Sequence, residues 1–297
     1  YQGQTSAEPY VLRIRYDEPV PETACPQLAP PVATAAPGRL GRLGDLPSDL
    51  GSVFLVNTQR FRARYGDAVT DRMLDRLRKV ANQPSVNGTI LPIDGDPAVR
   101  DAYAAWDANP CNTTTANAVV RSVGDLVRKV VTGDPDHNLP AHSGVRNVVL
   151  VGGDQMLPMG RLADTTKVGA EATYASQLPV GSQRSALASG HFLSDDPYGS
   201  LDASEWLNRR LYLPSLAVGR LVDTPQQITA QAETFVQTQG RVDPKAILAA
   251  GTTFMTDGAQ DVANTLRDAF AAAGNPNAGT LRSGPTVTTR TDWTKAQ

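Results

Sequence analysis

The feature that most constrains the fold of this chain is an apolar run from Val145 to Val151 that ends at Gly152 and Gly153. β-Branched and aliphatic residues fill the run almost without a break, which is typical of a strand buried on both faces of a parallel sheet. The two glycines predict a tight turn directly after it. Because ligands of open α/β sheets bind at the carboxyl edge of the strands, we expect Asp154 and its loop to lie at a functional rim.

Short apolar runs alternate with amphipathic segments along most of the chain. Strands are expected near Val53, Ile90, Val148, Leu216 and Ile247, with helices between them. This alternation favours a mostly parallel sheet with helices on both faces and right-handed crossovers. The expected fold class is therefore α/β, a three-layer α/β/α sandwich.

The chain divides by composition at about residue 50. Residues 1–50 are expected to hold an edge strand from Tyr10 to Tyr16 and an extended connector rich in Pro and Ala. Residues 51–297 are long enough for one large α/β domain. The last residues look like the start of a helix without the helix, so we expect the domain to be incomplete at its carboxyl end.

Composition and motifs exclude several classes of function. A net charge of -2 and a pI near 6.0 give no reason to expect nucleic acid as a partner, and no apolar stretch is long enough to span a membrane. The chain has three histidines and no Cys-x-x-Cys, which argues against zinc or haem. The phosphate-loop, dinucleotide and Gly-x-Ser-x-Gly patterns are all missing.

The acidic turn that begins at Ser194 is the second candidate for the rim. Asp195 and Asp196 are adjacent in it, and neighbouring carboxylates repel each other unless a cation or hydrogen-bond donors compensate. We expect the turn to be ordered and partly buried, tied either to Arg220 or Arg161 or to a calcium ion. Its predicted role is to support the site without performing the chemistry.

The calcium alternative has limits. The turn fails as an EF-hand, because Ser194 and Tyr198 stand where that loop needs carboxylates or amides. Gly199 is expected to allow a backbone conformation closed to other residues, and with Tyr198 it counts among the supporting residues. A calcium site of another geometry would use Asp195, Asp196 and Asp202; the other alternative is a solvated acidic turn.

The two cysteines, Cys25 and Cys111, both lie in irregular surroundings. The sequence leaves two alternatives for them. One is a disulfide that pins the amino-terminal segment to the body in an oxidising compartment, and the other is two unrelated thiols.

The order of several segments resembles the gingipain family of cysteine peptidases. The similarity covers roughly Val53 to Gly274 and implies a caspase-like fold, a secreted or cell-surface enzyme and, in many members, bound calcium without a required cofactor. The segments that carry it are Thr115-Ala-Asn-Ala-Val119, Val145 to Asp154, Ser194-Asp-Asp-Pro-Tyr-Gly199 and Leu216-Ala-Val-Gly-Arg220 with the proline-led helix after it.

The resemblance also locates the catalytic residues of the family. Their histidine follows a strand beyond the region matched by Asp292 to Gln297, and their cysteine lies one strand further, so this chain holds neither. Cys111 lies far from the nucleophile's position and has no partner that would lower its pKa. The loop matching Thr252 to Asp261 lines the substrate pocket in the family, so Asp257 or Asp261 is expected to face a basic side chain of a substrate.

The expected function is a cysteine endopeptidase that acts on proteins or peptides, with catalysis completed by the missing carboxyl-terminal part of the same domain. The alternative is a non-catalytic surface protein on the same scaffold, whose rim loops hold a partner. A small-molecule α/β enzyme ranks third, because the sequence has no cofactor fingerprint.

Overall fold

The computed structural model describes residues 35–166, 168–206, 209–222, 224–241, 249–251, 256–272 and 286–287. The chain forms two compact units, Tyr1–Gln237 and Thr238–Gln297, and each is described here by itself. Within the described residues no helix is both long enough and apolar enough to cross a membrane.

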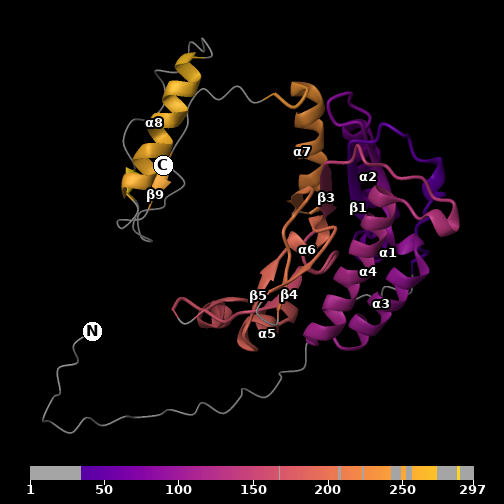
Figure 1. Cartoon of the computed structure of the whole chain (residues 1–297), viewed down its shortest axis with the longest axis horizontal. Helices are drawn as coiled ribbons and strands as arrows, with labels where there is room; N and C mark the ends of the chain where they lie inside the picture. Colours follow the sequence, from indigo (N-terminus) through magenta and orange to yellow (C-terminus); the bar gives the residue numbers. More distant parts are fainter. Residues whose placement is uncertain are drawn as a thin grey trace, which may run out of the picture. The chain divides into compact units, whose positions relative to one another are not determined.

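The first unit is built on a parallel sheet of four strands in the order β2-β1-β3-β8. Its two central strands, β1 and β3, lie side by side in Figure 1. Four of the five strands expected from the sequence are thereby confirmed, and they form one parallel sheet as predicted. The register aligns Phe54 with Ile90 on one side and with Val149 on the other. The strands are β1 (Ser52–Val56), β2 (Gly88–Pro92), β3 (Asn147–Val151) and β8 (Ala217–Leu221).

Helices connect these strands. The β1-to-β2 connection runs along the sheet in one direction and the β2-to-β3 connection in the other, so right-handed crossovers put their helices on opposite faces. This arrangement agrees with a three-layer α/β/α sandwich. The helices are α1 (Thr58–Tyr65), α2 (Asp67–Ala81), α3 (Pro97–Ala108), α4 (Thr113–Thr132) and, after β8, α7 (Pro225–Thr238).

Capping residues and apolar stripes explain why these helices form. Asn57, Asp96 and Asn112 each accept a hydrogen bond from a backbone N–H in the first turn of α1, α3 and α4. In α4 the buried residues recur every three or four positions, from Ala116 to Val131, which gives one apolar face. That face joins the side chains of β1 and β3 in a single core cluster.

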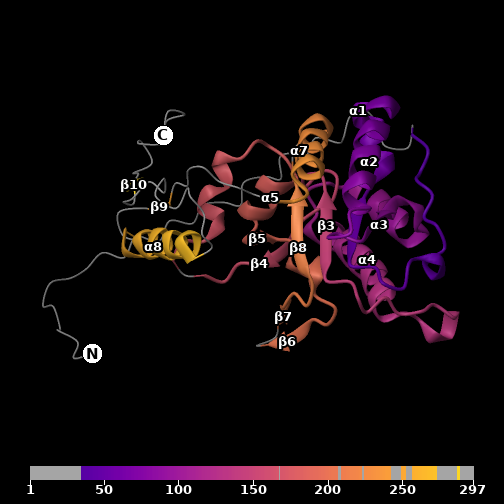
Figure 2. The same cartoon turned by 90° about the horizontal axis from the view of Figure 1, so that it is seen from above.

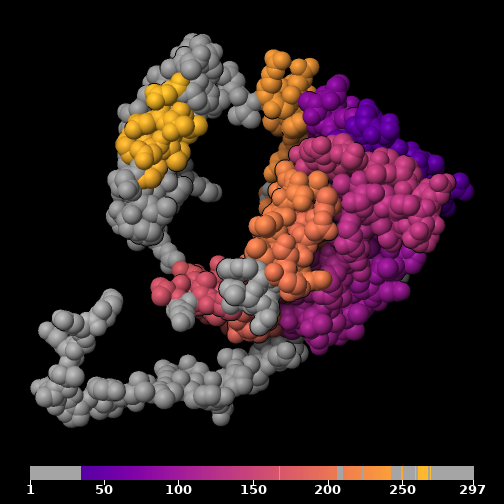
Figure 3. Space-filling model, viewed as in Figure 1, coloured from indigo at the N-terminus to yellow at the C-terminus, as the bar shows by residue number. Residues whose placement is uncertain are grey.

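The connection from β3 to β8 forms an extension beside the sheet. In Figure 2 β4, β5 and α5 lie beyond β8, at the edge of the sheet, and the hairpin of β6 and β7 projects below them. β4 and α6 also contact α4. In Figure 3 the orange atoms of α7 border the indigo and purple atoms of the amino-terminal part of the same unit. The elements are β4 (Gly160–Ala163), α5 (Ser182–Ala188), β5 (His191–Ser194), α6 (Asp196–Gly199), β6 (Ser204–Trp206) and β7 (Arg209–Leu211).

The described part of the expected connector, residues 35–50, packs on the first unit. Leu50 is fully buried, and Leu43 lies partly buried against the core. The ring of the buried His142 lies with Nδ1 3.0 Å from the carbonyl oxygen of Pro47. The expected strand from Tyr10 to Tyr16 lies outside the described residues.

Three described elements belong to the second unit: β9 (Ala250–Gly251), α8 (Thr256–Ala272) and β10 (Thr286–Val287). β9 and β10 pair in parallel. The core of the fifth expected strand, near Ile247, lies outside the described residues, so its membership of the sheet stays a prediction.

Candidate functional site

The loop from Gly152 to Met159, here called the edge loop, follows β3 at the carboxyl edge of the sheet. β1 and β3 are neighbours, but the chain leaves β1 toward one side of the sheet and β3 toward the other. Such a change of direction opens a crevice outside the strand ends, where ligands of α/β proteins bind. The edge loop and Asp154 therefore lie where the sequence placed a functional rim.

Gly152 makes the tight turn that the sequence predicted. Its φ of +101° is disfavoured for other residues, and an added Cβ would lie 2.6 Å from the Cβ of Met156. Its N–H donates to the carbonyl oxygen of Leu221 at 2.7 Å, which joins the turn to the end of β8.

Two buried tyrosines donate to carbonyl oxygens of the edge loop. The hydroxyl of Tyr103, on α3, lies 2.7 Å from the oxygen of Met156, and that of Tyr198, on α6, lies 2.6 Å from the oxygen of Pro158. Burial raises the pKa of both hydroxyls above the ordinary tyrosine value, so both stay neutral donors at physiological pH.

Three arginines donate to three further carbonyls of the loop. Arg60 reaches Gln155 and Arg220 reaches Leu157, at 2.8 and 2.9 Å, and Arg161 reaches Met159. Together with the tyrosines, these side chains engage every backbone carbonyl from Gln155 to Met159. The donors come from α1, α3, β4, α6 and β8, so the loop is fixed from several sides although it contains no helix or strand.

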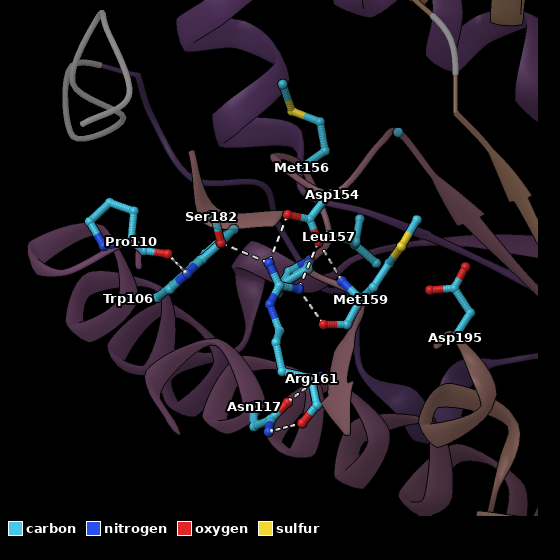
Figure 4. A network of polar contacts seen from close by, with 12 residues as sticks. Trp106, Pro110, Asn117, Asp154, Met156, Leu157, Met159, Arg161, Ser182 and Asp195 are labelled. Carbon is cyan, nitrogen blue, oxygen red and sulfur yellow. Dashed lines mark hydrogen bonds and ion pairs between the residues drawn. The ribbon is translucent and has the colours of Figure 1, made fainter. Parts of the chain in front are cut away.

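Asp154 and Arg161 form the most buried ion pair at the rim (Figure 4). Two parallel hydrogen bonds of 2.7 Å join the guanidinium to the carboxylate, and Asp154 Oδ1 also accepts from the N–H of Met159 at 2.8 Å. Arg161 further donates to Ser182 Oγ, and its N–H and C=O both bond to the amide of Asn117. Paired guanidinium and carboxylate planes of this kind are strong and directional.

Asp195 is paired with Arg220, one of the alternatives expected for the acidic turn. The two hydrogen bonds measure 2.6 and 2.7 Å, and Arg220 also donates to the carbonyl of Gly152 at 2.8 Å. Burial alone would lower the pKa of Arg220, but the hydrogen bonds and charge of Asp195 outweigh it, so the pKa lies above its usual value. The turn is thus ordered and tied to the sheet's edge strand.

The other residues of the turn differ in their roles. Tyr198 is buried and contacts the edge loop as described, whereas Asp196 is exposed. The expectation for the backbone of Gly199 is wrong: its φ is not positive, and glycine is needed because an added Cβ would meet the side chain of Val218 and the backbone of Leu216. Close packing, and not backbone strain, selects glycine there.

Metal ligation stays a prediction. In the part of the chain that the structure describes, no three His, Cys, Asp or Glu side chains gather as a metal site would require. Of the three expected calcium ligands, Asp195 is engaged by Arg220, and Asp196 and Asp202 are exposed.

The remaining predicted residues lie apart from the rim. Asp257 and Asp261 are on α8 in the second unit, where Asp261 is exposed. Cys111 is disulfide-bonded, and Cys25 lies outside the described residues. Their roles in a substrate pocket and as a disulfide pair stay predictions.

A serine and a histidine meet on the extension without forming a catalytic set. Ser189 Oγ lies 3.2 Å from His191 Nδ1, but it also donates to the carbonyl of Ala186 at 3.0 Å. Among the described residues no carboxylate accepts from the His191 ring to orient it. The pair therefore lacks the third member of a nucleophilic triad.

Sequence reasoning missed Arg60, which is fully buried behind the edge loop. Its guanidinium is paired with Asp107 at 2.8 Å and lies 4.9 and 5.2 Å from the ring centroids of Tyr103 and Trp106. Its Nη2 is buried without a hydrogen-bond partner. The signal available in the sequence was the pair of large aromatic residues three positions apart on α3, which can enclose a cation.

A cavity of about 470 Å³, here called the edge pocket, opens beside the edge loop. Its walls come from α1, from the edge loop, from α5 and from the start of α7 with the residues before it. Phe61 and Met156 supply apolar surface, and Gln155, Gln183 and Gln227 supply amides. Its size and mixed lining are those of small-ligand sites.

Comparisons of the chain with protein-family models, with curated proteins and with solved structures find no match.

Proposed function

We propose that this chain is the amino-terminal part of a secreted or cell-surface cysteine endopeptidase of the gingipain type, with a caspase-like fold. Its substrates are proteins or peptides, and its catalytic histidine and cysteine lie outside this sequence. The observation that carries the proposal is the parallel sheet in the order β2-β1-β3-β8, with an edge loop held rigidly at its carboxyl edge. Rigid edges of this kind position catalytic and substrate-binding groups.

In this proposal the rim supports the chemistry and does not perform it. Asp154 and Asp195 are both committed to arginines, so neither is a free general base. Cys111 is disulfide-bonded and so offers no thiolate. A disulfide also agrees with an extracellular location, because disulfides persist in oxidising compartments.

The same commitment of the carboxylates favours a second candidate, a non-catalytic binding protein on this scaffold. Asp154, the charged residue of the edge loop, is paired internally, as a structural rim needs. The two candidates differ in whether the whole protein contains a reactive thiol.

The deciding experiment uses the full-length parent protein. We expect it to cleave fluorogenic peptides, to lose activity on iodoacetamide treatment, and to carry the alkyl group on one cysteine outside this sequence, as mapped by mass spectrometry. Cys111 serves as the internal control, because a disulfide sulfur does not react without prior reduction. Absence of both cleavage and labelling would assign the protein to the non-catalytic alternative.

A further inference from the structure

Among the described residues that line the edge pocket, one positive charge has no carboxylate partner. Of these residues, only Arg64 and Asp154 are charged. The carboxylate of Asp154 already accepts two hydrogen bonds from Arg161, so it does not balance the charge of Arg64. Arg64 has no carboxylate within ion-pair distance in the part of the chain that the structure describes. The pocket therefore attracts negative charge.

Arg64 is exposed and has an aromatic neighbour. Its guanidinium lies 5.7 Å from the ring centroid of Tyr65, which also lines the pocket. Arg62, two residues earlier on α1, differs because it is paired with both Asp67 and Asp71 and does not line the pocket. A guanidinium that lies over an aromatic ring keeps the N–H donors at its edge free for a carboxylate.

The other lining residues indicate which kind of negatively charged ligand the pocket accepts. Phe61 and Met156 are buried and supply apolar surface. The amides of Gln155 and Gln183 can both donate and accept hydrogen bonds, which suits an amide-containing ligand. Gln227 offers only its Nε2 donor, because its Oε1 already accepts from Thr224. We propose that the edge pocket binds a carboxylate on a short apolar stem, as in the glutamate side chain of a peptide or in a free dicarboxylate such as glutarate. This proposal does not rest on the peptidase proposal.

Calorimetric titration of the full chain tests this inference. The probes are a blocked tripeptide with a central glutamate, the same peptide with glutamine, and glutarate. The glutamate peptide should bind saturably and about tenfold more tightly than the glutamine peptide, because one charge-assisted pairing distinguishes them. Glutarate binding as tightly as the glutamate peptide assigns the pocket to small dicarboxylates, and weaker glutarate binding assigns it to peptides.

Three variants locate the charge. Arg64→Gln should bind the two peptides equally, whereas Arg64→Lys should keep part of the preference for glutamate because the charge remains. The matched control, Arg62→Gln, removes a cation from the same helix outside the pocket and should leave the preference unchanged. Equal binding of the two peptides by the unaltered chain, no saturable binding of any probe, or a preference that survives Arg64→Gln would each overturn the proposal. The measurement detects binding only, so its result is independent of catalytic activity.

Discussion

The rim contains two aspartates that follow strands, each paired with one arginine by two hydrogen bonds, yet the two pairs are built differently. The side chains of Asp154 and Arg161 are 5% and 1% exposed, and those of Asp195 and Arg220 are 24% and 5% exposed. Asp154 also accepts from the backbone of the edge loop, whereas Asp195 joins a separate turn to β8. The Asp154–Arg161 pair is buried within the edge loop, whereas the Asp195–Arg220 pair joins the acidic turn to the edge of the sheet.

The largest expected effect is that of Asp154→Ala. The variant leaves the buried charge of Arg161 and the N–H of Met159 without their main partner, so the free energy of unfolding should fall by about 3–5 kcal/mol. Urea denaturation of the full chain measures this change. Adding Arg161→Met should recover part of the loss, because it removes the unpaired charge. A loss below about 1 kcal/mol would contradict the buried role of this pair.

Asp195→Ala should have a smaller effect, about 2 kcal/mol. Arg220 keeps its hydrogen bonds to Gly152 and Leu157, and water can reach the position of the partly exposed carboxylate. Denaturation of the two single variants under the same conditions gives the comparison directly. An effect equal to that of Asp154→Ala would show that burial does not separate the two pairs.

The two pairs were also unequally predictable. The acidic turn was predictable, because adjacent carboxylates repel each other unless a cation or donors compensate. Arg220 was one of the two arginines expected to pair with it. The strands were predictable from apolar runs, since burial on both faces selects β-branched residues. The hydrogen bonds to the edge loop were not predictable, because their acceptors are backbone carbonyls, which every residue type carries. Tyr103 and Arg60 reach those carbonyls from helices distant in sequence, and only the fold brings them together.

The tyrosines that hold the edge loop predict a loss of stability at high pH. Burial raises the folded-state pKa of Tyr103 and Tyr198, whereas in the unfolded chain both ionise near pH 10. Their contribution is complete below about pH 10 and is lost as pH rises from there toward the raised folded values. The double Phe variant should be about 2 kcal/mol less stable at pH 8 and should lose less between pH 9 and pH 11. Equal slopes for the two proteins would contradict this assignment.

The smallest expected effect is that of Asp196→Ala, within about 0.5 kcal/mol of the unaltered chain. Its carboxylate is exposed and, in the part of the chain that the structure describes, makes no hydrogen bond or ion pair, in contrast to the adjacent Asp195. Thermal unfolding with and without millimolar calcium sharpens the comparison, because a ligand that binds only the folded state raises the midpoint. If calcium raises the midpoint of unfolding and both Asp196→Ala and Asp202→Ala remove that rise, the turn binds calcium in addition to its pairing with Arg220. A rise that neither substitution affects would put any calcium elsewhere and leave Asp195 and Arg220 as the whole of the turn's contribution to the rim.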